Sequence, residues 1–113
     1  MDCVFCKIIN REIESQLVHE DEKIIAFKDI EPVAPVHLLI VPKKHIPSIE
    51  GLKAEDAGLI GEMFLVAQKI ARKQGVAQSG YRLSFNIGKD AGQTVDHLHL
   101  HLMGGKKLLM ESN

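Results

Sequence analysis

The sequence predicts a single domain, residues 1–113, that contains both strands and helices. Three patterns lead to this prediction. Residues 97–103 alternate histidine with apolar residues, which suits the two faces of a strand. Residues 54–74 repeat apolar side chains every three or four positions, which is typical of a helix. Residues 16–20 and 24–29 flank an acidic turn and read as a β-hairpin.

The remaining segments complete this outline. Residues 3–10 place apolar side chains at helical spacing, with Asp2 available as the N-cap of a short helix. Residues 37–42 form a mostly apolar strand that we expect to be central in a sheet, and residues 81–86 alternate like another strand. The glycine-rich loop 88–94 could make an ordinary turn or bring backbone N–H groups to an anion. We favour the second interpretation, because the loop leads directly into the histidine run.

Composition excludes several classes of protein. The formal net charge is −1, so no general affinity for nucleic acid is expected. No apolar run approaches the ~20 residues of a membrane-spanning helix, and no apolar signal segment follows Met1. Only two cysteines are present, Cys3 and Cys6. We therefore expect a protein of the reducing cytoplasm that binds neither nucleic acid nor membrane.

The histidine run is the most informative feature of the chain. In a strand, His97, His99 and His101 would share one face, and the intervening leucines would enter the core from the other. Neighbours on one face lie roughly 6.5–7 Å apart, so adjacent imidazoles can converge on one phosphate or one metal ion. A purely structural role is disfavoured, because three half-polar rings on one face all need hydrogen-bond partners. A three-histidine metal site, as in some zinc hydrolases, is the main competing interpretation.

The cysteines form a Cys-x-x-Cys pair that has three interpretations. Cys3 and Cys6 could be small hydrophobic residues of the core. A redox pair is less favoured, because no βαβ pattern follows. The pair could also be half of a zinc site, which needs two more ligands from elsewhere; His45 and His97 are the candidates.

Several motifs together resemble one protein family. The run at residues 97–103 resembles the signature of the histidine triad (HIT) superfamily, in which three histidines alternate with apolar residues. Four further segments resemble the nucleotide-binding (HINT) branch of that superfamily, in the same order and at similar spacing. The resemblance extends from about Val4 to Gly105. The four segments are Phe27-Lys28-Asp29-Ile30, Ala34-Pro35-Val36-His37, Val41-Pro42-Lys43-Lys44-His45 and Gly92-Gln93-Thr94-Val95.

The resemblance implies a fold and an activity. The fold would be the α+β HIT-like fold, a five-stranded antiparallel sheet with one long and one short helix. Two copies would form a homodimer with a continuous ten-stranded sheet. The ligand would be a purine nucleotide of the AMP or GMP type, released as a nucleoside monophosphate from a phosphoramidate or an acyl-nucleotide. Hydrolysis of dinucleoside polyphosphates, or nucleotide binding with little turnover, are the alternatives.

The resemblance also implies roles for four histidines. His99 would attack the α-phosphorus, and water would then cleave the nucleotidyl-histidine intermediate. Its second ring nitrogen would donate to the backbone carbonyl of His97, which fixes the tautomer. His101 would bind phosphate oxygens and is the candidate to protonate the leaving group, while His37 would belong to the polar network at the phosphate. This chemistry requires no metal, because imidazolium and N–H donors can stabilise the developing charge.

The nucleotide-binding positions follow from the same resemblance. Asp29 would accept hydrogen bonds from the ribose hydroxyls. Apolar residues would pack the purine, although each of them would be ordinary core without the resemblance. The purine positions are Val4, Phe5, Ile8, Phe27, Ile30 and Leu39; the phosphate positions are Asn86, Gly92 and Thr94, and Gln93 belongs to the same nucleotide-binding set.

Two features set this chain apart from some members of the family. Bacterial-type relatives carry a structural zinc ion on the cysteine pair, and that pattern maps to Cys3, Cys6, His45 and His97. In addition, residues 106–113 lack the Trp-Pro ending of some HINT proteins. Because the C-terminus helps to set leaving-group preference in those proteins, the physiological substrate stays open.

Overall fold

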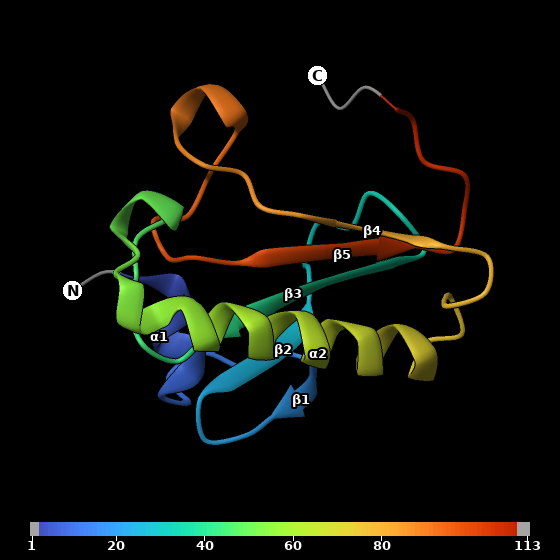
Figure 1. The fold of residues 1–113 in the computed structure, drawn as a ribbon. Coiled ribbons are helices and arrows are strands. Elements are labelled where there is room, and N and C mark those ends of the chain that lie inside the picture. Colours follow the sequence, from blue (N-terminus) through green and yellow to red (C-terminus); the bar gives the residue numbers. More distant parts are fainter. Residues whose placement is uncertain (1–2, 111–113) are drawn as a thin grey trace.

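The computed structural model describes residues 3–110, and its elements follow the expected order (Figure 1). The helices are α1 (Val4–Ile9) and α2 (Ala57–Lys73). The strands are β1 (Leu17–Glu20), β2 (Ile24–Lys28), β3 (Val36–Pro42), β4 (Tyr81–Ser84) and β5 (Leu100–Gly104). Three short 3-10 turns, η1 (Ile49–Gly51), η2 (Ala54–Asp56) and η3 (Lys89–Ala91), lie in the connections.

The five strands form one antiparallel sheet in the order β1-β2-β3-β5-β4. The apolar strand β3 is central, as its sequence predicts, and it pairs with β2 on one side and β5 on the other. The α+β prediction is therefore confirmed: one five-stranded antiparallel sheet, one long helix and one short helix.

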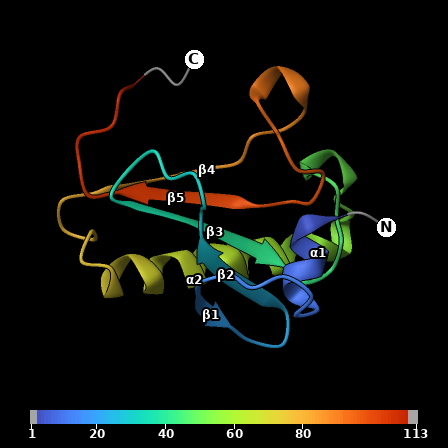
Figure 2. The same cartoon turned by 180° about the vertical axis from the view of Figure 1, so that it is seen from behind.

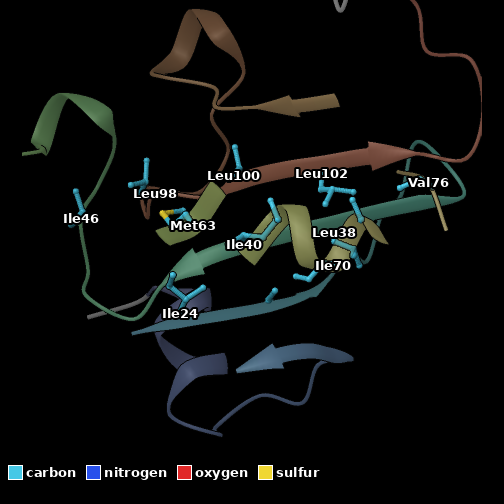
Figure 3. Close-up of a cluster of buried hydrophobic side chains, with 13 residues drawn as sticks. Ile24, Leu38, Ile40, Ile46, Met63, Ile70, Val76, Leu98, Leu100 and Leu102 are labelled. Carbon is cyan, nitrogen blue, oxygen red and sulfur yellow. The ribbon is translucent and has the colours of Figure 1, made fainter. Parts of the chain in front are cut away.

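Each face of the sheet packs against one helix. On the first face, Leu38 and Ile40 of β3 belong to the larger core with Met63 and Ile70 of α2 (Figure 3). On the opposite face, alternate residues of β2 and β3 form a smaller core with Phe5 of α1. Figures 1 and 2 show the two helices on opposite sides of the sheet. The side chains of the histidine region face the α1 side, because the intervening leucines fill the larger core.

The histidine strand is shorter than predicted. Pairing with β3 begins at Leu100, opposite Ile40, so His97 and His99 lie before β5 and not within it. The reason is a contact outside the sheet: the backbone N–H of Leu98 donates to the carbonyl of Ile46, at 2.7 Å. The backbone nevertheless keeps the alternation, since the leucines at positions 98, 100 and 102 are all buried in the larger core as predicted.

The predicted helix at residues 54–74 is a 3-10 turn followed by an α-helix. Asp56 is 5% exposed and holds this turn, because its carboxylate accepts from the backbone N–H of Lys53 at 2.9 Å and from Lys44 Nζ at 2.8 Å. At the other end, Gly75 follows the helix with φ +78°, the left-handed conformation that ends many helices.

Other boundaries differ by one or two residues. The helix predicted at residues 3–10 is α1, and the Sγ atom of Cys3, its N-cap, accepts from the backbone N–H of Cys6 at 3.3 Å. The predicted cap, Asp2, lies outside the described residues. Within residues 3–110, no helix is long and apolar enough to cross a membrane.

Candidate active site

Four histidines gather on the α1 side of the sheet. His101 lies in β5 opposite Leu39, and His37 lies near the start of β3. His97 and His99 occupy the extended segment that leads into β5. Three of these rings are buried, with 0% of His97, 6% of His99 and 7% of His37 exposed. Their ring nitrogens therefore need hydrogen-bond partners within the protein.

The ring of His99 has one defined tautomer. Its Nδ1 lies 2.7 Å from the carbonyl oxygen of His97. A carbonyl can only accept, so Nδ1 carries the proton and donates it there. The lone pair of the neutral ring is then on Nε2. Phe5 packs edge-on against this imidazole, with ring centroids 5.1 Å apart, and holds its plane. This bond to the carbonyl of His97 is the one that the family resemblance implies, and the lone pair that it leaves on Nε2 can act chemically as a nucleophile.

A hydrogen-bond chain fixes the tautomers of His37 and His101 as well. The backbone N–H of Val33 donates to His37 Nδ1 at 3.1 Å, which leaves the proton of the neutral ring on Nε2. That Nε2–H faces His101 Nδ1 at 3.0 Å and Asp29 Oδ2 at 3.3 Å. His101 Nδ1 accepts, so its own proton sits on Nε2. The chain therefore gives His101 a free N–H donor beside His99, whose ring centroid is 4.9 Å away.

Burial keeps the rings of His37 and His101 neutral. Burial lowers the pKa of His37, against the opposing effect of the Asp29 carboxylate. Burial also lowers the pKa of His101 to about 4, and the neighbouring His99 and His37 act in the same direction. Both rings are therefore uncharged near pH 7, as the chain of donors and acceptors requires.

Asp29, His37 and His101 could be mistaken for a metal site. One ligand atom from each lies within 4.8 Å of the others. His37, however, uses its ring lone pair at Nδ1 to accept from Val33, so its Nε2 offers a proton to the cluster and no lone pair. This set is better described as a hydrogen-bond chain.

A second cluster has the chemistry of a metal centre. Cys3, Cys6, His45 and His97 each place a ligand atom within 4.8 Å of the others. His97 Nε2 donates to the carbonyl of Pro42 at 2.8 Å, so the lone pair of Nδ1 points into the cluster. This Nδ1 lies 3.3 Å from Cys3 Sγ, 3.6 Å from Cys6 Sγ and 3.1 Å from His45 Nδ1.

These spacings match a small tetrahedral ion. Zinc with Zn–S of about 2.3 Å and Zn–N of about 2.0–2.1 Å places sulfur and nitrogen ligands about 3.5 Å apart and two nitrogens about 3.3 Å apart. Burial, reinforced by the neighbouring Cys3, raises the pKa of the Cys6 thiol. A bound cation would reverse this effect by stabilising the thiolate. The Cys₂His₂ set can therefore hold a metal ion.

The three-histidine metal site, the competing interpretation, is not supported. Among residues 3–110, neither cluster of possible ligands combines His97, His99 and His101. His97 instead links two sites: its ring belongs to the cysteine cluster, and its carbonyl orients His99.

The purine positions divide into two groups. Phe5, Ile8, Phe27 and Leu39 lie in the smaller core and are 3–7% exposed. Val4 and Ile30 differ, because 40% and 90% of their surfaces are exposed. Asp29 follows β2, and its Oδ1 accepts from the backbone N–H of Glu31 at 2.9 Å.

The phosphate positions surround the loop before the histidines. A Cβ added at Gly92, whose φ is +80°, would lie 3.9 Å from Asn86 Nδ2, so these two residues are adjacent. Gln93 uses its side chain within the protein: its Oε1 accepts from the backbone N–H of Gly88, and its Nε2 donates to the carbonyls of Pro47 and Val95. Thr94 is exposed. Gln93 thus shapes the loop that contains Gly92 and Thr94 and lies beside Asn86.

Comparison with known proteins agrees with this geometry. Residues 2–112 match the family model described as "Scavenger mRNA decapping enzyme C-term binding". The chain is 46% identical over 107 residues to purine nucleoside phosphoramidase of Escherichia coli (strain K12), which covers 95% of this chain and 90% of that protein.

Solved structures give the same result. A histidine triad protein from Clostridium difficile is 46% identical with a TM-score of 0.95, covering 99% of this chain and 97% of that chain. A HIT family hydrolase from Legionella pneumophila is 46% identical with a TM-score of 0.94, covering 96% of this chain and 97% of that chain. The chain therefore belongs to the histidine triad (HIT) superfamily, as a HINT-like homologue of the purine nucleoside phosphoramidase.

Proposed function

We propose that this protein hydrolyses purine nucleoside phosphoramidates and acyl-nucleotides, and releases a nucleoside monophosphate. One observation carries the proposal: the 2.7 Å bond from His99 Nδ1 to the His97 carbonyl leaves a lone pair on Nε2 in a buried polar cluster. The similarity to the phosphoramidase of Escherichia coli supports the same substrate class.

The reaction has two steps at phosphorus. His99 Nε2 attacks the α-phosphorus, the bond to the leaving nitrogen or acyl oxygen breaks, and a nucleotidyl-histidine forms. Water then attacks the same phosphorus and restores His99. The negative charge of a bound phosphate opposes the effects that lower the pKa of His101. His101 can then carry a proton to the leaving group and regain one from the attacking water.

The binding roles follow from positions along the hydrogen-bond chain. Asp29 lies at its outer end, where its carboxylate can accept from the ribose 2′- and 3′-hydroxyls. The loop at residues 88–94, with Asn86, Gly92 and Thr94, would hold the phosphate, and Gln93 would keep that loop in shape. Val4 and Ile30 offer apolar surface to the purine, over the core formed by Phe5, Ile8, Phe27 and Leu39.

A structural zinc ion on Cys3, Cys6, His45 and His97 belongs to the same proposal. The donor set and the spacings between the ligand atoms support it. The ion would anchor α1 and the segment before β5, and would take no part in the chemistry. Two free thiols placed as ligands also fit the reducing cytoplasm.

We also infer a homodimer. β4 is an edge strand, and within residues 3–110 its outer side pairs with no other strand. On α2, Phe64 and Leu65 are 41% and 65% exposed, and Phe64 packs on Phe85, which follows β4. Pairing of two β4 edges would give a ten-stranded sheet and cover these apolar side chains. Analytical ultracentrifugation should give twice the chain mass, and Leu65→Asp should shift the protein toward the monomer.

The activity is tested with a substrate panel. Adenosine and guanosine 5′-phosphoramidates, an acyl-adenylate and a dinucleoside polyphosphate are given to the wild type, His99→Ala and His19→Ala. We expect the wild type to hydrolyse the phosphoramidates and the acyl-adenylate. In His99→Ala, kcat/KM should fall by about 10³–10⁶-fold. His19→Ala should show no loss, because His19 lies in β1 and pairs with Asp21. Cleavage of the polyphosphate alone, or comparable rates in His99→Ala, would contradict the proposal.

A further inference from the structure

Strand β4 presents a serine to the face of the sheet that carries the histidines. Tyr81 and Leu83 of this strand, and Phe85 just after it, pack against the larger core on the α2 side. Successive side chains of a strand point to opposite faces, so Ser84 points away from α2. Ser84 therefore lies on the side of the sheet where the active site lies.

The register of the sheet places Ser84 directly beside His101. The two residues are partners in the antiparallel pairing of β4 with β5, which puts their Cα atoms about 4.5–5.5 Å apart. On the other side of β5, His101 lies opposite Leu39 of β3. A serine oxygen is bonded directly to Cβ, so the backbone register fixes the place of the hydroxyl, as it could not for a long side chain. The hydroxyl of Ser84 therefore lies next to the imidazole of His101.

The hydroxyl of Ser84 is open to a ligand. Ser84 is half-buried, and no hydrogen bond joins its side chain to another group within residues 3–110. Every fully buried side-chain oxygen or nitrogen of this part of the chain has a hydrogen-bond partner, so an unpaired hydroxyl here is reachable from outside. The dimer inferred above would pair the backbone edge of β4 and leave the side chains of this face uncovered.

The function proposed above, on which this inference rests, brings the leaving group to the same place. The attacking and leaving atoms at phosphorus lie roughly in line, so the leaving nitrogen faces away from His99 and toward His101, which follows it on the same face. Asp29 and His37 occupy the β3 side of His101, because His37 Nε2 lies 3.0 Å from His101 Nδ1 and 3.3 Å from Asp29 Oδ2. With the ribose at Asp29, the β4 side, beside Ser84, is left for the leaving group.

A hydroxyl at this position suits a leaving nitrogen that carries a hydrogen atom. Such a nitrogen leaves as an amine when it gains a proton, and its lone pair must face His101 for that transfer. A hydrogen bond from its N–H to a neighbouring acceptor fixes the rotation about the P–N bond and so directs the lone pair.

We propose that Ser84 is a further substrate-contacting residue, whose Oγ accepts the N–H of the leaving nitrogen and turns the lone pair toward His101 Nε2. The proton that His101 holds passes to this lone pair. The P–N bond then breaks with its electron pair on nitrogen, while the bond from His99 Nε2 to phosphorus forms, and the amine departs. The hydroxyl of Ser84 keeps its own proton throughout.

Two substrates that differ by one methyl group test this contact. Adenosine 5′-N-methylphosphoramidate keeps one N–H on the leaving nitrogen, whereas the N,N-dimethyl compound has none. Ser84→Ala should lower kcat/KM about 3–12-fold for the first and less than about twofold for the second, because only the first can use the hydroxyl. Ser84→Thr, which keeps a hydroxyl on a side chain suited to a strand, should restore most of the wild-type ratio between the two substrates.

Two controls separate a contact with the leaving group from other effects. Ser79→Ala, the same change in the exposed turn after α2, should leave both rates unchanged. AMP lacks the leaving nitrogen, so its affinity for Ser84→Ala, measured by calorimetry, should stay within about twofold of the wild-type value. An equal loss of kcat/KM for both phosphoramidates, no loss for either, or an equally large loss of AMP affinity would overturn the role of Ser84. Hydrolysis of neither phosphoramidate by the wild type would overturn the proposed function itself, which distinguishes the two failures.

Discussion

The low pKa of His101 predicts a measurable dependence of stability on pH. In the folded protein the pKa is about 4, whereas an unfolded histidine titrates near 6.5. Between these two values the unfolded chain binds more protons than the folded one, so the free energy of unfolding falls as the pH is lowered from about 6.5 to about 4. Above this window the contribution of His101 to stability is complete, and below it no more is lost.

The size of the effect follows from the shift. A difference of about 2.5 pKa units corresponds to about 3.4 kcal/mol when the group is fully shielded from water. His101 is half-buried, and solvent screening reduces such a contribution, so we expect about 1.5–2 kcal/mol. His101→Gln should lose this part of the pH dependence and keep the rest, which comes from His37, His97 and the carboxylates.

Urea denaturation at several pH values between 4 and 7 measures the effect. The free energy of unfolding of the wild type should fall by about 1.5–2 kcal/mol more than that of His101→Gln over this window. His19→Gln, a change at the surface pair with Asp21, should keep the wild-type slope. Identical slopes for the wild type and His101→Gln would show that burial does not lower the pKa of His101 in the folded protein.

Three further predictions concern the metal centre, the core beneath the site and the ribose. Removal of metal by a chelator, or Cys6→Ser, should lower the melting temperature, while hydrolysis continues at temperatures where the protein stays folded. Immediate loss of activity with an unchanged melting temperature would contradict a purely structural ion. Phe5→Ala should lower the free energy of unfolding, measured with denaturant, by about 3–5 kcal/mol, because Phe5 is 6% exposed and contacts His97, His99 and Phe27. A decrease below about 1 kcal/mol would exclude that packing role. Asp29→Asn should reduce the preference for ribose over 2′-deoxyribose nucleotides about 10-fold in binding assays, and an unchanged preference would remove Asp29 from the ribose site.

Local sequence patterns predicted the elements well and their edges less well. The alternation at residues 97–103 correctly placed the leucines in the core, because the side-chain period of an extended chain is two whether or not the chain pairs. It could not locate the start of β5. That boundary depends on the bond from Leu98 N–H to Ile46, a residue distant in sequence.

In the active site, too, the sequence predicted some features and not others. The residue types alone named His45 and His97 as candidate partners of Cys3 and Cys6, and the family resemblance then implied that these four residues form one ligand set, which the structure brings together. The groups that set the tautomers had no sequence signal, because the partners of His37 and His97 are the backbone N–H of Val33 and the backbone carbonyl of Pro42. Any residue type presents these groups.

The proposed reaction depends on transfer of the nucleotide to one ring nitrogen of His99. Rapid mixing of the protein with a purine nucleoside phosphoramidate, acid quenching within milliseconds and mass spectrometry of the digested chain test this directly. We predict a peptide that carries one nucleotidyl group on His99, formed and lost at rates compatible with turnover, and absent in His99→Ala. Full turnover with no nucleotidyl group on the protein, or with the group on His101 or His37, would exclude His99 as the nucleophile.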